Sequence, residues 1–208
     1  MLLVFDLDGT LFQAKPIFLS ALRELFEDLG LSVPDEDTII KYARRDISAM
    51  LHDVLPSGAD LTGTRLLYKD IISKAITDKG ELFPGVKEML VQLNEDGHTL
   101  FVCSNSPREY ISKVLTHTGI HGLISRFCST ADSAMTKATA VKGLIIRPYS
   151  PESPAIVIGD THQDIAAAHE NGLLAIAVNY GYGNKQMLEK ADYFADSPAE
   201  IVKIISQW

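Results

Sequence analysis

The sequence predicts an α/β protein built on a doubly wound parallel sheet, with a small all-helical domain inserted after the first strand. Two observations support this fold class. Four short runs are apolar at consecutive positions, as expected of strands buried on both faces of a parallel sheet: 1–6, 98–104, 154–159 and 173–178. Amphipathic stretches separate these runs, and strands that alternate with helices form a parallel sheet covered on both faces.

The helices between the strands are marked by their ends. We expect them over 85–96, 107–118, 137–147 and 163–171. Pro107 opens the second and Gly172 closes the last, in keeping with the preference for proline in the first helical turn and glycine just after the end. A further short strand is expected near 126–130.

The segment between residues 15 and 80 departs from this alternation. It contains no stretch that predicts a strand, and helical periodicity appears over 16–29, 35–54 and 62–78. We therefore assign residues 1–14 and 81–208 to one α/β domain and residues 15–80 to a helical insertion.

The composition excludes several classes of protein. A chain of 208 residues that is 46% hydrophobic and 22% charged has the balance of a folded globular protein. Its net charge of −8 argues against general binding to nucleic acid. No apolar run approaches the roughly 18 residues of a membrane-spanning helix, and Met1 leads directly into a strand rather than a secretory signal. We expect a cytoplasmic protein without nucleic-acid or membrane partners; its oligomeric state is not predicted.

Acidic and hydroxyl side chains follow three of the predicted strands. They are Asp6 and Asp8 after the first, Ser104, Asn105 and Ser106 after the second, and Asp160 and Asp164 after the third. The carboxyl ends of parallel strands meet at one edge of the sheet, where ligands bind in open α/β folds. Carboxylates held this close repel one another unless a cation lies between them, and Mg²⁺ prefers such oxygen ligands. The sequence therefore predicts a magnesium site at this edge.

The same motifs resemble those of the haloacid dehalogenase-like (HAD) hydrolases, and within them the phosphoglycolate-phosphatase-like branch. DLDGTL at 6–11 is the most specific, SNS at 104–106 is similar to the second family motif, and IGDTHQDIAAAHENG at 158–172 is similar to the fourth. The resemblance covers the chain apart from the insertion. It implies a Rossmann-like core, and it makes the insertion a cap domain that closes over the site.

The resemblance further implies a magnesium-dependent phosphatase that acts on a small phosphorylated metabolite. Asp6 would be the nucleophile, forming an aspartyl-phosphate, and also a metal ligand. Asp8 would transfer the proton to and from the leaving group and bind the metal through its backbone carbonyl. Asp160 would complete the protein ligands of Mg²⁺. Asp164 would lie just outside them, fixing a metal-bound water or orienting a lysine.

The phosphoryl oxygens would be held by Ser104, the Asn105 backbone and a lysine, with Gly9 and Thr10 shaping the loop and contacting phosphate or the metal-site backbone. Two lysines compete for this role. Lys137 opens a helix after the short strand, whereas Lys142 lies within that helix. We assign Lys137, although the proline that usually follows this lysine in the family is replaced here by Ala138.

Other functions remain open on the sequence alone. A dehalogenase has no use for a second acid, so Asp8 favours phosphoryl transfer. A sugar phosphomutase shares every core motif, and a non-catalytic binder of phosphorylated metabolites could retain the scaffold. Arg44 and Arg45 in the insertion are expected to contact a second anionic group of the substrate, because arginine binds carboxylate or phosphate with two parallel hydrogen bonds.

Overall fold

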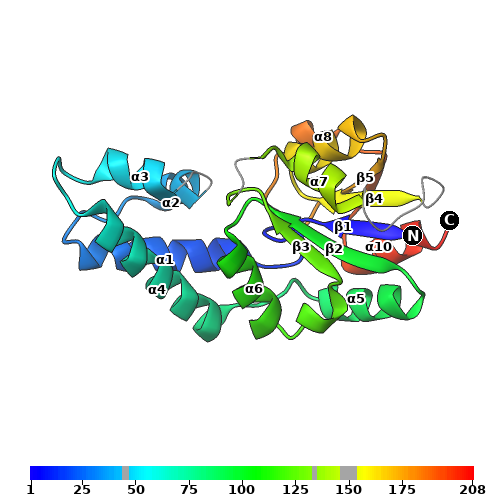
Figure 1. Cartoon of the computed structure of the whole chain (residues 1–208), viewed down its shortest axis with the longest axis horizontal. Helices are drawn as coiled ribbons and strands as arrows, with labels where there is room; N and C mark the ends of the chain where they lie inside the picture. The colour runs from blue at the N-terminus through cyan, green and yellow to red at the C-terminus, as the bar shows by residue number, and fades with distance from the viewer. Residues whose placement is uncertain (44–46, 133–134, 146–153) are drawn as a thin grey trace. The chain divides into compact units, whose positions relative to one another are not determined.

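The computed structural model describes residues 1–43, 47–132, 135–145 and 154–208. Its strands are β1 (Leu2–Phe5), β2 (Thr99–Ser104), β3 (Arg126–Ser129), β4 (Ala155–Gly159), β5 (Leu174–Val178) and β6 (Tyr193–Ala195). They form one sheet in the order β3-β2-β1-β4-β5-β6, and every neighbouring pair is parallel (Figure 1). The predicted parallel sheet is confirmed.

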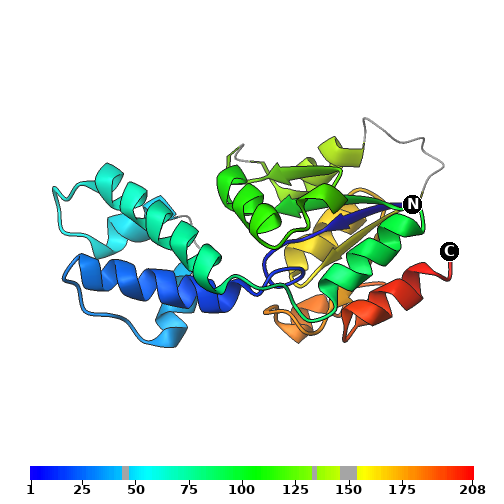
Figure 2. The same ribbon diagram turned by 90° about the horizontal axis from the view of Figure 1, so that it is seen from below.

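The chain divides into two compact units, Met1–Gln13 with Leu82–Trp208, and Ala14–Glu81. The helices of the first unit are α5 (Val86–Glu95), α6 (Arg108–His117), the short 3₁₀ helix His121–Leu123, α7 (Lys137–Ile145), α8 (His162–Glu170), α9 (Lys185–Leu188) and α10 (Pro198–Ile205). Helices α5 and α10 pack together on one face of the sheet, and α7 and α8 pack together on the other (Figures 1 and 2). This is the doubly wound arrangement that the sequence predicts.

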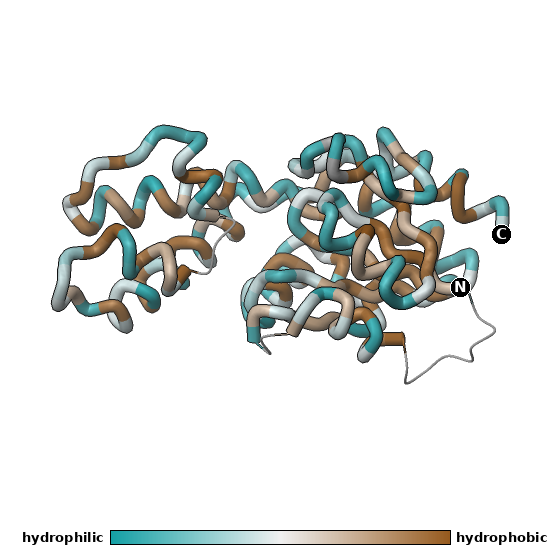
Figure 3. The backbone as a smooth tube through the Cα atoms, turned by 90° about the horizontal axis from the view of Figure 1, so that it is seen from above, coloured by the Kyte–Doolittle hydropathy of each residue, from teal (hydrophilic) through white to brown (hydrophobic). Residues whose placement is uncertain are grey.

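Strand β1 lies in the middle of the sheet and is buried along its whole length. Its last residue, Phe5, is in register with Val102 of β2 and Ile158 of β4. The strands form the hydrophobic interior of this unit, as the hydropathy colouring in Figure 3 shows. Strands β2 and β3 lie on one side of β1 and β4 to β6 on the other, so the winding reverses between β1 and β4. In open α/β sheets this reversal marks the ligand-binding crevice.

Helices are the regular structure in the described residues of the second unit, and turns and loops connect them. Its helices are α1 (Ala14–Asp28), α2 (Glu36–Ala43), α3 (Ile47–Val54) and α4 (Leu61–Lys79). Helix α1 packs against α2 and α4, and Asp60 caps α4 by accepting a hydrogen bond from the Gly63 amide (2.9 Å). The predicted helical stretch 35–54 corresponds to α2 and α3. Arg44 and Arg45 lie outside the described residues, so their contact with a substrate stays a prediction.

Three elements near the C-terminus were not predicted: the short helix α9, strand β6 and helix α10. Strand β6 has three residues at the edge of the sheet, and its central Phe194 is 46% exposed, so it lacks the long apolar run that marks the other strands. Helix α10 follows, with Pro198 in its first turn. None of the described helices is both long and apolar enough to cross a bilayer.

Candidate active site

The chain turns sharply as β1 ends. The Asp6 amide still donates to the Ile158 carbonyl of β4 (2.8 Å), which fixes Asp6 at the edge of the sheet. The Leu7 carbonyl then accepts the Leu11 amide (2.9 Å), and Gly9 adopts a left-handed φ of 93°. Glycine reaches that conformation without steric cost. Asp6 is therefore held rigidly and buried, with the acid-bearing loop folded back beside it.

Lys137 lies at the centre of a buried cluster of charges. Its ammonium nitrogen is 2.5 Å from Asp6 Oδ1 and 2.5 Å from Asp164 Oδ1. Lys137 is the first residue of α7 and is 6% exposed, whereas Lys142 on the same helix is exposed. Of the two lysines that the sequence offered, the structure brings Lys137 to the acids and leaves Lys142 at the surface.

Asp164 is immobilised by the start of α8. Its Oδ2 accepts hydrogen bonds from the Thr161 amide (3.0 Å) and hydroxyl (2.7 Å), while Oδ1 is paired with Lys137. The first of these bonds satisfies the Thr161 amide, a backbone donor at the start of the helix. Both carboxylate oxygens are thus engaged, and Asp164 aims the Lys137 ammonium at Asp6.

The two lysines make a direct test of this cluster. Lys137→Met should lower the free energy of unfolding by about 3–5 kcal/mol, because Asp6 and Asp164 would be left buried without their cation. Lys142→Met is the matched control on the same helix and should change stability by less than about 0.5 kcal/mol. Urea denaturation in the presence of EDTA measures both. Equal stability of the two variants would contradict the ion cluster.

Asp160 follows β4 and has one oxygen engaged and one available. The Tyr182 amide donates to its Oδ2 (2.8 Å), whereas its buried Oδ1 has no hydrogen-bond partner among the residues that the structure describes. Carboxylate oxygens of Asp6, Asp160 and Asp164 lie within 4.8 Å of one another. Three buried carboxylates around one ammonium group leave an excess of negative charge. In addition, burying a hydrogen-bond acceptor without a donor raises the free energy of the folded state. A divalent cation bound by Asp6 and Asp160 fits both features.

The environment changes the acidity of these groups. Burial raises the pKa of Asp6 well above its usual value against the opposing attraction of Lys137, and repulsion from Asp164 and Asp160 adds to the rise. Burial likewise raises the pKa of Asp160 to about 6, although the Tyr182 amide opposes the rise. Burial alone would lower the pKa of Lys137, but Asp164 and Asp6 raise it above the ordinary value. The lysine therefore stays charged, and the acids favour the approach of a cation.

Asp8 is held by two hydroxyl groups from the segment after β2. Ser106 Oγ donates to Asp8 Oδ2 (2.7 Å), and the Tyr110 hydroxyl donates to Asp8 Oδ1 (2.8 Å). Tyr110 lies in the first turn of α6, and its ring packs edge-on against Phe12 (6.5 Å between centroids). Burial raises the pKa of Asp8, and the two donated hydrogen bonds partly counteract that rise. The sequence predicted neither contact: Ser106 was expected only at the same edge of the sheet, and Tyr110 only within a helix.

The expected phosphate-binding residues lie at the same edge. Ser104 is the buried last residue of β2, and its hydroxyl oxygen accepts the Ser106 amide (3.1 Å). The Asn105 side chain accepts from Thr130 Oγ1 (2.8 Å) and donates to Gln163 Oε1 (2.6 Å). Because that side chain is already engaged, a phosphate contact at Asn105 would come from its backbone, as expected.

Gly9 and Thr10 lie in the turn that follows Asp6, and their contact with phosphate or the metal site stays a prediction. Their amides are used within the turn, since Gly9 donates to the Phe12 carbonyl (3.0 Å) and Thr10 to the Leu7 carbonyl (3.3 Å). The Thr10 hydroxyl is buried and has no hydrogen-bond partner among the described residues. A ligand contact from this pair would thus be made by the Thr10 hydroxyl rather than by the two amides.

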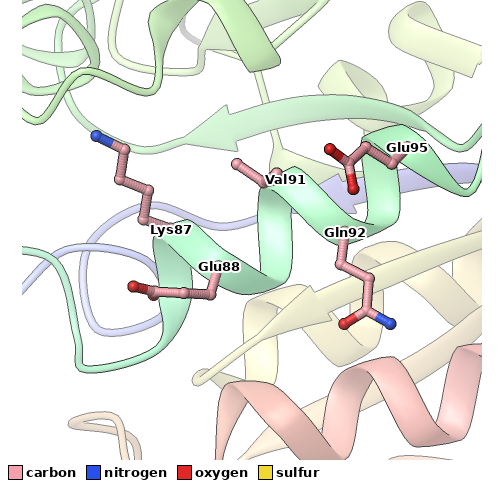
Figure 4. A pocket seen from close by; sticks show the side chains of 5 residues that line it. All are labelled: Lys87, Glu88, Val91, Gln92 and Glu95. Atoms are coloured by element: carbon pink, nitrogen blue, oxygen red, sulfur yellow. The ribbon is translucent and has the colours of Figure 1, made fainter.

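A separate hollow lies along the outer surface of α5. It is lined by Lys87, Glu88, Val91, Gln92 and Glu95 (Figure 4). All five side chains come from one helix, and none of the acids at the ends of β1 and β4 contributes to it. The hollow adds no group to the candidate active site.

Comparison with known proteins decides the family. The model of the haloacid dehalogenase-like hydrolases matches residues 3–178. The chain belongs to this family. Among relatives of this HAD-like hydrolase, the phosphoglycolate phosphatase of Vibrio parahaemolyticus is 24% identical over 99% of this chain and 96% of its own, and that of Synechococcus elongatus is 26% identical over 99% and 97%.

Solved structures agree with this membership. A haloacid dehalogenase-like family hydrolase from Streptococcus pneumoniae superposes with a TM-score of 0.81 at 25% identity, covering 98% of this chain and 97% of its own. This HAD-like hydrolase therefore has the α/β fold of a solved member of its family. Phosphatases are among the curated relatives that match nearly the whole chain.

Proposed function

We propose that this hydrolase is a magnesium-dependent phosphatase that cleaves a small phosphate monoester through an aspartyl-phosphate on Asp6. One observation carries the proposal: Asp6 lies at the switch point of the sheet, in one buried cluster with Lys137, Asp160 and Asp164. The phosphoglycolate phosphatases among its relatives support phosphoglycolate, or a metabolite of similar size, as substrate.

Asp6, Asp160 and the backbone carbonyl of Asp8 would hold the Mg²⁺. When bound, the ion neutralises the phosphoryl charge that otherwise repels an attacking carboxylate. Asp164 remains outside the ligand set in this proposal, because both of its oxygens are already occupied by Thr161 and Lys137. Its role is to hold the Lys137 ammonium where a phosphoryl oxygen would meet it.

The chain's own residues would carry the covalent chemistry. A carboxylate oxygen of Asp6 forms a bond to phosphorus as the bond to the leaving oxygen breaks, and Asp8 gives that oxygen a proton. Asp8 then takes a proton from the water that attacks the phosphorus of the aspartyl-phosphate, which releases inorganic phosphate and restores Asp6. Lys137, the Ser104 hydroxyl and the Asn105 backbone would hold the phosphoryl oxygens throughout.

Removal of the metal tests the proposal directly. With p-nitrophenyl phosphate as substrate, EDTA should lower the rate by at least about 100-fold, because the charge on the phosphoryl group would no longer be neutralised. Added Mg²⁺ should restore the rate, whereas K⁺ at the same ionic strength should not. A rate that is indifferent to EDTA would overturn the metal assignment, and no hydrolysis under any condition would point to a non-catalytic binder.

The substrate class requires a second experiment. A panel of phosphorylated metabolites that includes phosphoglycolate and hexose phosphates, assayed with Mg²⁺ for released inorganic phosphate, should identify a preferred small monoester. Nuclear magnetic resonance of the products distinguishes hydrolysis from transfer. Isomerisation of a hexose phosphate without release of phosphate would replace the phosphatase proposal by that of a sugar phosphomutase.

A further inference from the structure

The loop after β5 is built closely around Asp160. It comprises residues 179–184, Asn-Tyr-Gly-Tyr-Gly-Asn. At its centre the Tyr182 amide donates to Asp160 Oδ2 (2.8 Å), which leaves Oδ1 as the oxygen that has no donor among the described residues. The loop thus determines which carboxylate oxygen of Asp160 is satisfied by protein and which is free for another partner.

Two glycines of this loop allow the approach. A Cβ atom at Gly181 would overlap both the Asp160 side chain and the Gly9 carbonyl oxygen, and a Cβ atom at Gly183 would overlap the Asp160 carbonyl oxygen. Neither glycine has a left-handed φ. The requirement is therefore for space and not for an unusual backbone conformation. Any larger residue would have to displace Asp160 or the loop.

The same loop is attached to the turn after β1. The Tyr180 hydroxyl donates to the Thr10 carbonyl (3.1 Å), and Tyr180 is partly buried. The ring of Phe83 packs against the rings of Tyr180 and Tyr182, with centroid separations of 5.0 and 5.9 Å. The loop after β5 therefore contacts both the turn that follows Asp6 and the carboxylate of Asp160. Asp6 follows β1 and Asp160 follows β4, the two strands at the switch point.

We propose that residues 180–183 are a positioning loop, which holds Asp160 through Oδ2, leaves Oδ1 open to a cation and so sets the affinity of the site for Mg²⁺. This inference rests on the proposed function for the identity of the ion. The physical reason is preorganisation: a carboxylate fixed through its other oxygen loses less freedom when it binds a cation, and such supporting contacts commonly change metal affinity by about 10–100-fold.

The test is direct titration of the full-length protein with Mg²⁺ by isothermal calorimetry, so that it does not depend on turnover. Gly181→Ala and Gly183→Ala should each raise the Mg²⁺ dissociation constant by about 10-fold or more. Gly122→Ala is the matched control, because nothing lies within 4 Å of a Cβ atom built there. Circular dichroism and the melting temperature in EDTA should show that the variants remain folded.

A second variant covers the case in which the glycine variants fail to fold. Tyr180→Phe removes only the hydroxyl that holds the Thr10 carbonyl and keeps the ring against Phe83. It should raise the Mg²⁺ dissociation constant by about three- to tenfold. If Gly181→Ala and Gly183→Ala fold and bind Mg²⁺ within about twofold of the wild-type affinity, the positioning role is wrong. If they do not fold, the same result for Tyr180→Phe would overturn it.

Asp160→Asn separates this inference from the proposed function. If Asp160→Asn abolishes Mg²⁺ binding while the loop variants bind normally, only the positioning loop is wrong. If Asp160→Asn binds Mg²⁺ like the wild type, Asp160 is not a ligand. Both the assignment of Asp160 to the metal site and the proposed positioning loop would then be wrong. Recovery of the activity of the glycine variants at raised Mg²⁺ concentration would support the inference, because a general loss of structure would not be reversed in that way.

Discussion

Asp6→Asn should abolish turnover while leaving the protein folded, with a fall in kcat of about four to six orders of magnitude. The amide of asparagine is almost the same size as the carboxylate but cannot attack phosphorus. Its carbonyl oxygen can still accept a hydrogen bond from Lys137, which also keeps its ion pair with Asp164. The substitution removes one of three neighbouring buried acids, so little loss of stability is expected.

Two measurements make this result specific. Wild-type protein that is quenched in acid during turnover should carry the additional mass of one phosphoryl group on the peptide containing Asp6, and Asp6→Asn should not. Asp96→Asn is the matched control, because Asp96 is exposed at the end of α5. Wild-type rates for Asp6→Asn, or an equal loss in Asp96→Asn, would show that the covalent mechanism is wrong.

The fold could be predicted well where local pattern and tertiary structure agree. A strand such as β1, apolar at every position because both faces are covered, is recognisable without any partner. The edge of the sheet that carries the candidate site was predictable for a related reason. Asp6 and Asp160 each follow such a strand directly, so the topology of the sheet alone brings them together. Strand β6 was missed because three residues at an edge give no comparable signal.

The contacts that refine the site were not predictable, because they join residues that are far apart in the chain. Tyr110 donates to an acid 102 positions earlier, and its place in the predicted helix gave no hint of that partner. Gly181 and Gly183 are both packed against Asp160 in the structure, a contact that the sequence alone did not indicate. The close approach of two backbones leaves no periodic pattern, and only a three-dimensional arrangement shows which atom each glycine accommodates.

Asp8→Asn should slow hydrolysis selectively, according to the leaving group. For alkyl phosphates such as phosphoglycolate, the leaving oxygen needs a proton, and kcat should fall by about 10²–10⁴-fold. The p-nitrophenolate leaving group needs little protonation, so its rate should fall by less than about 10-fold. The amide should be accommodated at the site, because it can accept a hydrogen bond from one of the hydroxyls of Ser106 and Tyr110 and donate to the other.

Tyr110→Phe extends the same test to the residue that orients Asp8. The ring would still pack against Phe12, but Asp8 Oδ1 would lose its donor and could turn away from the leaving oxygen. We expect the same selectivity at smaller size, about a 10-fold loss with alkyl phosphates and nearly none with p-nitrophenyl phosphate. Tyr193→Phe, at the far edge of the sheet, is the control and should be without effect on either substrate. Equal losses on both substrates, in Asp8→Asn as in Tyr110→Phe, would mean that Asp8 positions the metal or the substrate and does not carry the proton.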